Sequence, residues 1–231
     1  MKKISKLTVI TTLITLLPIV LGIALYDRLP DVVATHWGID NQPNGWSSKA
    51  MAVFGMPGIL ALINLVCSTA MEICPDSPFV KVRPVSIKAV GGWEKENKLA
   101  DKVSPRLMWL CRWIIPVLSL ILVPVMLYSA MGVSFDMDRI VCSILGIMFI
   151  IIGNYLPKCR RNGVVGIKIP WTLSSDENWD KTHRFAGFVW IVCGAAAIVG
   201  GWTKPVVVIV ALVAMILLPV VYSGILKHKG I

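Results

Sequence analysis

Hydrophobic residues occur along the chain in long uninterrupted runs rather than at the spacing of one helix face or one strand face. A helix needs roughly 20 apolar residues to cross a bilayer, and a helix of a soluble domain keeps a polar face. The pattern therefore predicts an all-α integral membrane protein with six transmembrane helices, and Arg112 is the one charged residue inside them. The runs cover about residues 7–25, 51–71, 107–131, 140–156, 185–201 and 205–226.

The composition and the distribution of charge support a membrane protein and predict its orientation. Of the 231 residues, 56% are hydrophobic and 16% are charged, whereas soluble domains average about 45–50% and about 25%. With both termini in the cytoplasm, all but four of the 23 lysines and arginines fall on the cytoplasmic side. The positive-inside rule thus predicts an N-in, C-in topology. This topology and anionic membrane lipids account for the net charge of +10 without a direct nucleic-acid partner.

The runs and the loops between them divide the chain into three parts. Residues 1–72 are predicted to form a two-helix module with an extracellular loop at 26–50, and residues 73–106 a basic cytoplasmic linker. Residues 107–231 are predicted to form a four-helix module with a cytoplasmic loop at 157–184. The first run is too long for a signal peptide and lacks an A-x-A site, so we expect a retained helix. Prolines expected to kink the helices are Pro18, Pro57, Pro116 and Pro124.

The residue types that bind metals or carry out catalysis are scattered. The six cysteines form no C-x-x-C pair, and His36, His183 and His228 fall on different loops, so we expect no metal site and no cofactor. The runs contain no Asp, Glu or His, which disfavours a proton-coupled carrier. The sequence also lacks P-loop, G-x-S-x-G and H-E-x-x-H motifs.

The predicted extracellular loop carries the first distinctive pattern. Pro30 and Pro43 restrain its backbone, and Asn44-Gly45 is a strong turn signal. Its two tryptophans suit the headgroup region of a membrane, so an ordinary loop with tryptophan anchors is an alternative to a binding site. The candidate interaction residues are His36, Trp37, Asn44, Gly45, Trp46 and Lys49.

The predicted cytoplasmic loop carries the second pattern. Ser174 and Glu177 have the spacing of a capping box, which predicts that a helix begins near Ser175 and continues into the fifth span. Cations, tryptophans and a histidine gather there, either to anchor the loop to headgroups or to bind a partner. The candidate residues are Asn154, Pro157, Lys168, Pro170, Trp171, Ser174, Glu177, Trp179, His183 and Arg184.

These two loops carry a resemblance to a known family. The segment G-N-Y-L-P-K from Gly153, followed by G-I-K-I-P-W-T-L-S-S-D-E-N-W-D-K-T-H-R-F-A-G, and the outer T-H-W and P-N-G-W resemble the SdpI family. That family comprises membrane immunity proteins that protect bacteria from a secreted toxic peptide. The resemblance covers about residues 7–71 and 140–226, with departures at Ala34, Asn44 and Val164-Val165.

The resemblance implies a non-enzymatic immunity protein of the bacterial cell membrane. The outer candidate residues would then face a secreted peptide toxin. The cytoplasmic candidates would face a transcriptional repressor, if this member also signals. Two alternatives stay open: a small-solute channel or exporter, and a membrane enzyme using His183, Asp180 and Glu177 on a lipid or cell-envelope substrate. Small residues at Gly194, Ala197, Gly200 and Gly201 permit close helix packing and leave the oligomeric state undecided.

Overall fold

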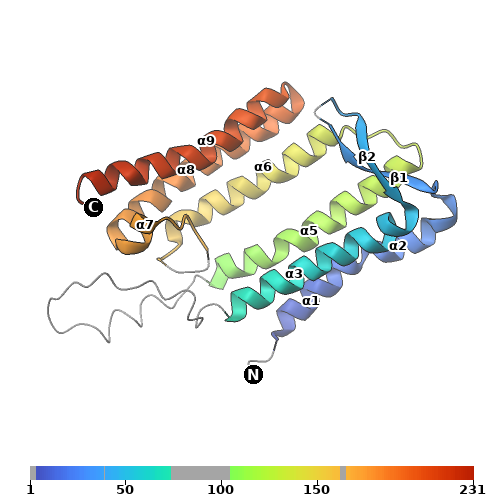
Figure 1. Cartoon of the computed structure of the whole chain (residues 1–231), viewed down its shortest axis with the longest axis horizontal. Coiled ribbons are helices and arrows are strands. Elements are labelled where there is room, and N and C mark those ends of the chain that lie inside the picture. Colours follow the sequence, from blue (N-terminus) through green and yellow to red (C-terminus); the bar gives the residue numbers. More distant parts are fainter. Residues whose placement is uncertain (1–3, 39, 74–104, 162–164) are drawn as a thin grey trace. The chain divides into compact units, whose positions relative to one another are not determined.

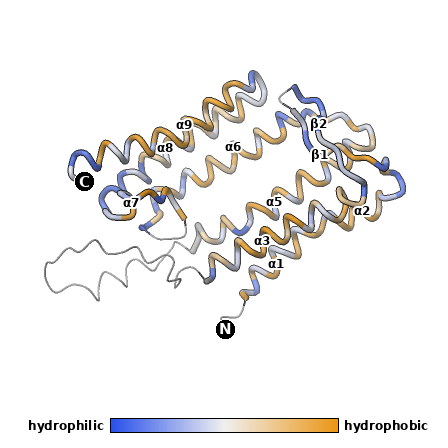
Figure 2. Tube along the Cα trace, viewed as in Figure 1, coloured by the Kyte–Doolittle hydropathy of each residue, from blue (hydrophilic) through white to orange (hydrophobic). Residues whose placement is uncertain are grey.

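The computed structural model describes residues 4–38, 40–73, 105–161 and 165–231 (Figure 1). Within these ranges, six helices are long and apolar enough to cross a membrane, which confirms the predicted spans and the all-α membrane fold. Figure 2 shows hydrophobic residues along these helices and hydrophilic ones near their ends. The chain is thus a multi-pass membrane protein. The linker predicted at 73–106 falls almost wholly outside the described residues.

The described residues form two compact units. Of the described residues, the N-terminal unit combines 4–38 and 40–72 with 110–141, and the C-terminal unit combines 105–109 with 142–161 and 165–231. The third span therefore packs largely with the first two. The helices of the N-terminal unit are α1 (Lys6–Leu16), α2 (Pro18–Leu25), the 3₁₀ turn η1 (Tyr26–Arg28), the π-helical turn η2 (Met51–Gly55), α3 (Met56–Ile73) and most of α5 (Pro105–Ala130).

Proline affects these helices to different extents. Proline lacks a backbone N–H, and Pro18 separates α1 from α2 at the predicted position. Pro57 is the second residue of α3, which begins directly after the π-helical turn η2, where the regular hydrogen-bond ladder changes. Pro116 and Pro124 instead lie inside α5, which continues through both as one helix. Only the first of the four prolines thus divides a span into two helices.

The predicted extracellular loop is a β-hairpin rather than an irregular loop. Strands β1 (Val32–Trp37) and β2 (Pro43–Ser48) pair antiparallel. The turn predicted at Asn44-Gly45 is wrong, because both residues lie in β2. The chain reverses at 38–42 instead, where Asn41 takes a φ of 57° and the Gly38 N–H donates to the Gln42 carbonyl at 2.9 Å. The hairpin base packs on a core of Leu29, Val33, Ala52, Val53, Val123, Met126 and Leu127.

Gly45 is explained by the close approach of the two strands and not by a turn. Gly45 lies opposite His36 at a register shift, and a Cβ added there would lie 2.9 Å from the His36 Cβ. Such a distance is too short for two side-chain carbons, so this close approach requires glycine.

The C-terminal unit contains the remaining helices and the second candidate loop. Its core joins α8 and α9 through Val189, Cys193, Ala211 and Met215. The elements are α6 (Met137–Tyr155), of which the first residues belong to the N-terminal unit, the 3₁₀ turn η5 (Leu156–Lys158), α7 (Pro170–Ser174), α8 (Asp176–Trp202) and α9 (Pro205–His228).

The start of α8 confirms one part of the capping prediction and corrects another. The helix begins next to Ser175 and continues without a break through the fifth span, as predicted. The cap, however, is Ser175, whose hydroxyl accepts a hydrogen bond from the Asn178 N–H at 3.2 Å. Ser174 is the last residue of α7, and its hydroxyl donates to the Trp171 carbonyl at 3.1 Å. Because two serines are adjacent, the sequence pattern placed the cap one residue too early. Ser174 cannot cap α8, since it is the last residue of the short helix α7.

Candidate functional site

The hairpin presents a small polar and aromatic surface. The His36 ring donates from Nδ1 to the Asn44 amide oxygen at 2.5 Å across the strands, and both side chains are exposed. Trp46 is 59% exposed, which is unusual for a tryptophan on a regular strand. Trp37 is half-buried and packs against the hairpin core. His36, Asn44 and Trp46 are thus the outer candidates that a binding partner can reach directly.

Lys49 closes the base of the hairpin. Its ammonium lies 2.9 Å from the Asp31 carboxylate and 5.3 Å from the centre of the Tyr26 ring. The hydrogen bond from Lys49 holds the pKa of the Asp31 carboxyl below its usual value, and the same bond raises the pKa of Lys49. The Lys49 N–H also donates to the Asp31 carbonyl at 3.0 Å. Lys49 therefore holds the strand ends together as well as adding charge.

A largely buried charge pair lies at the far end of α3, and only its arginine was evident from the sequence. The Arg112 guanidinium lies 3.1 Å from the Glu72 carboxylate. That carboxylate also accepts hydrogen bonds from the Thr8 hydroxyl at 2.5 Å and from the Ser5 backbone N–H at 3.1 Å, as well as from the Ser5 hydroxyl. The isolated arginine in an apolar run was the signal that a partner had to exist, because membrane charges are rarely unpaired.

A line of buried polar side chains continues from this pair between α1, α3 and α5. The Asn64 amide lies 3.2 Å from the Thr11 hydroxyl and 3.1 Å from the Thr12 hydroxyl. The Ser119 hydroxyl donates to the Thr15 carbonyl at 2.8 Å. Small hydroxyl side chains allow close helix contact in a membrane and bond across it. This polar line therefore fastens the three helices together.

In the C-terminal unit, Trp179 and His183 form the buried centre of the second candidate loop. Their rings stack with centroids 3.9 Å apart, and both side chains are fully buried. The Trp179 indole N–H donates to the Cys159 carbonyl at 2.7 Å. His183 donates from Nδ1 to the Trp179 carbonyl at 2.8 Å and accepts at Nε2 from the Ile167 N–H at 3.0 Å. These bonds fix the neutral tautomer and fasten the loop to α8.

Gly166 makes this arrangement possible. Its φ is +128°, a conformation that side chains rarely adopt. A Cβ there would lie 2.5 Å from the His183 Nε2 and 2.8 Å from the Trp179 ring. The motif G-I-K-I-P-W therefore begins with glycine because the His183 and Trp179 rings leave no space for a side chain at position 166.

A second set of hydrogen bonds ties α8 to α9. The Asn178 amide donates to the Ser223 and Ile231 carbonyls, each at 3.1 Å. Its oxygen accepts from the Ser223 hydroxyl at 2.6 Å and from the Thr182 hydroxyl at 3.1 Å. All hydrogen-bonding positions of the Asn178 side chain are thereby occupied. Asn178 of the motif therefore serves to hold α8 against α9.

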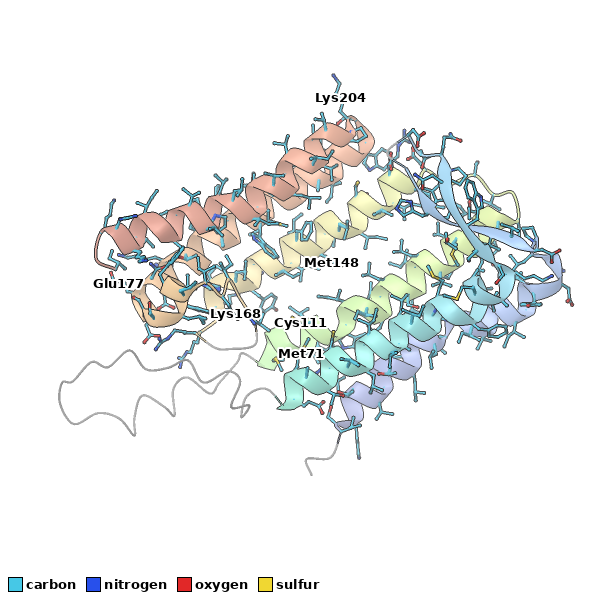
Figure 3. All side chains as sticks on the ribbon, in the orientation of Figure 1. Met71, Cys111, Met148, Lys168, Glu177 and Lys204 are labelled. Carbon is cyan, nitrogen blue, oxygen red and sulfur yellow. The ribbon has the colours of Figure 1, made fainter. Side chains whose placement is uncertain are left out.

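The other cytoplasmic candidates lie at the surface of the C-terminal unit. Trp171 is half-buried beneath the Lys227 ammonium, 5.0 Å above its ring, and Glu177 pairs with Lys181 at 2.7 Å. Figure 3 shows Glu177 at the opposite end of the α8–α9 pair from Lys204. Exposed candidates are Asn154, Pro157, Lys168, Pro170, Ser174, Glu177 and Arg184.

The described residues contain no group of three or more His, Cys, Asp or Glu side chains that could hold a metal ion. Among the described cysteines, Cys67, Cys111 and Cys193 have free thiols. Cys74 lies outside the described residues.

Comparison with known proteins finds relatives of both units. The model of the SdpI/YfhL protein family matches residues 158–223, and that of a domain of unknown function, DUF1648, matches residues 13–61, including the hairpin. The immunity protein SdpI of Bacillus subtilis (strain 168) is 24% identical over 223 residues, which are 96% of this chain and 95% of that protein. No solved structure matches the chain. The chain is thus similar to the SdpI/YfhL family over the segment that holds the buried Trp179–His183 motif, and to an SdpI immunity protein along nearly its whole length.

Proposed function

We propose that this chain is an immunity protein of the bacterial cell membrane that protects its host from a secreted toxic peptide. The observation that carries the proposal is the similarity to an immunity protein along 96% of the chain. The similarity extends over the hairpin as well as the C-terminal motif, so it is not confined to one structural element.

The hairpin is the proposed site of contact with the peptide. The N-in, C-in topology inferred from the cations would put residues 32–48 outside the cell, where a secreted peptide arrives first. Exposed Trp46 beside the His36–Asn44 pair offers an aromatic contact and polar groups on a paired backbone. Aromatic anchors commonly dominate binding energy because they bury a large area at low entropic cost.

An enzymatic function finds little support in the C-terminal unit. His183 is the one histidine of the proposed acid/base group, and both of its ring nitrogens already bond to backbone groups. A general base needs a nitrogen within reach of substrate. We therefore propose a non-enzymatic role.

A second role, recruitment of a cytoplasmic repressor, is favoured by one feature. The surface around α7 and the start of α8 is exposed and charged, with Lys168, Glu177 and Arg184 among its side chains. Such a surface suits a charged protein partner, since complementary charge speeds encounter. We propose this role only for a host that contains such a repressor.

The proposal is tested by expressing the full chain in a toxin-sensitive bacterium. The cells are challenged with a peptide toxin of the sporulation-delay type, and survival is compared with that of cells carrying an empty vector. Survival at toxin concentrations that kill the control supports immunity. Equal killing, with the chain detected in the membrane fraction, contradicts it.

A further inference from the structure

A basic pocket opens between α8 and α9 at the end where Glu177 and Lys229 lie. It has a volume of about 470 Å³ and is lined by the cations Lys181, Arg184 and Lys229 together with Phe185, Tyr222, Leu226 and Ile231. The Lys181 ammonium also forms an ion pair with the Glu177 carboxylate at 2.7 Å. Arg184 and Lys229 form no ion pair with any carboxylate that the structure describes. Arg184 and Lys229 thus bring two positive charges to an open space in which no described side-chain carboxylate pairs with them.

The pocket lies at the boundary between charged and apolar surface. The Phe185 and Tyr222 rings pack with centroids 4.5 Å apart at its apolar side. Beyond them, toward the groove, Phe188 of α8 and Leu218 of α9 are 68% and 47% exposed. Aromatic rings followed by exposed aliphatic side chains mark the depth at which a helix enters the hydrocarbon of a membrane.

A separate apolar groove lies further along the same two helices. It has a volume of about 320 Å³ and is lined by aliphatic side chains and one cysteine, including Val192, Ala196, Val207 and Ala211. On α8, positions 181, 185, 188, 192 and 196 recur at intervals of three and four, so pocket and groove share one helix face. On α9, positions 229, 222, 218, 211 and 207 share a face in the same way.

The two cavities together have the dimensions of one leaflet. Phe185 and Ala196 are eleven positions apart, which corresponds to about 16 Å along a helix. Half of a bilayer's hydrocarbon core is about 15 Å thick. One molecule with an anionic head and an acyl chain would therefore fill both cavities.

We infer that the seam between α8 and α9 binds an anionic phospholipid. The phosphate lies against the Arg184 guanidinium and the Lys229 ammonium, and an acyl chain follows the groove past Phe188 to Ala196. Basic pockets between transmembrane helices are suited to lipid headgroups because the phosphate and the membrane boundary coincide there. A free phosphate would use the cations but not the groove.

The test uses the full chain in detergent, with binding measured by native mass spectrometry and by lipid-dependent thermal stability. Phosphatidylglycerol is compared with phosphatidylcholine of the same acyl chains and with glycerophosphate, which has the anionic head alone. We expect phosphatidylglycerol to bind at least about tenfold more tightly than either. Equal binding of phosphatidylcholine would overturn the assignment of the phosphate site, and equal binding of glycerophosphate would overturn the assignment of the groove.

Matched variants test the residues. The double variant R184Q/K229Q should weaken phosphatidylglycerol binding by about tenfold or more. The control K204Q/K227Q removes the same charge from the two ends of α9 without altering a pocket-lining residue, and it should bind as the unaltered chain does. Val192→Trp, which fills the groove, should weaken lipid binding and leave weak glycerophosphate binding unchanged. Unchanged lipid binding in R184Q/K229Q, or an equal loss in the control, would overturn the inference independently of any toxin assay.

Discussion

Gly153 of α6 and Gly187 of α8 approach each other so closely that a Cβ added to either would lie within 3 Å of the other's carbonyl oxygen. An added Cβ would lie 2.9 Å from the opposite oxygen at Gly153 and 2.7 Å at Gly187. Two helical turns away, Gly146 and Gly194 repeat the arrangement at 2.5 and 2.6 Å. Gly194, one of the small residues predicted to permit close helix packing, thus forms a contact between α6 and α8 of the same chain.

The glycine contact predicts a steric effect of substitution. Gly187→Val should force α6 and α8 apart and lower the free energy of unfolding by about 1–3 kcal/mol, the usual cost of overpacking. Gly224→Val in α9 is the matched control, because an added Cβ there meets nothing within 4 Å. Thermal unfolding of both variants in the same detergent measures the difference. Equal stability of the two variants would contradict the proposed contact.

The helix cap predicts a difference between neighbouring serines. Ser175→Ala should remove the bond to the Asn178 N–H and destabilise the start of α8 by about 1 kcal/mol. Ser174→Ala should have a smaller effect, because the exposed Ser174 hydroxyl bonds only to the Trp171 carbonyl within α7. Protease cleavage between Arg161 and Arg184 reports on this segment. Faster cleavage in the Ser174 variant than in the Ser175 variant would mean that the cap is assigned to the wrong residue.

The Glu72–Arg112 pair predicts non-additive mutant effects. Arg112→Gln should destabilise the N-terminal unit by up to about 3 kcal/mol, because the largely buried Glu72 carboxylate loses its opposite charge. The double variant E72Q/R112Q should recover much of this loss, since no uncompensated charge remains. Stability of the wild type, both single variants and the double variant gives the coupling energy. Purely additive effects would show that the pair is not coupled in the membrane.

The ion pair at the hairpin base predicts a dependence on pH. Because the pKa of Asp31 is lowered from its ordinary value of 3.8, its contribution is present above that value and is lost as the pH falls through the lowered pKa. Because the pKa of Lys49 is raised from 10.5, the same contribution persists below that value and is lost as the pH rises through the raised pKa. NMR titration of Asp31 should give a midpoint below 3.8.

The control for this titration removes one cation at a time. Lys49→Gln should return the Asp31 midpoint toward its ordinary value, whereas Arg28→Gln, which removes a neighbouring cation, should change it less. An unchanged midpoint in the Lys49 variant would show that the bond between Lys49 and Asp31 does not persist in solution.

The spans could be predicted from the sequence because burial in lipid requires a continuous apolar run and leaves a strong signal. The hairpin could not, since two strands of six residues with little alternation resemble an irregular loop. The partner of Arg112 was missed because Glu72 lies just outside its apolar run and 40 positions away in the chain. Pairing over such a distance depends on helix packing rather than on local pattern.

The residues of the second candidate loop could be predicted from the sequence, but not which of them are buried and which are exposed. Sequence motifs brought Trp179, His183 and Arg184 together as one exposed group. The structure buries the first two beneath Gly166 and leaves Arg184 at the surface. A loop rich in polar residues has no hydrophobic period from which burial can be inferred, so the separation became visible only from three-dimensional contacts.

Survival under toxin challenge in cells expressing Trp46→Ala tests the proposed role of the hairpin most directly. Trp202→Ala is the matched control, because Trp202 is 61% exposed, close to the 59% of Trp46, and lies outside the hairpin. At equal amounts of protein in the membrane, the Trp46 variant should require about tenfold less toxin for killing, as expected for loss of an aromatic anchor. The Trp202 variant should protect as the wild type does. Full protection by the Trp46 variant, or an equal loss in both variants, would contradict the proposal that the hairpin meets the toxin.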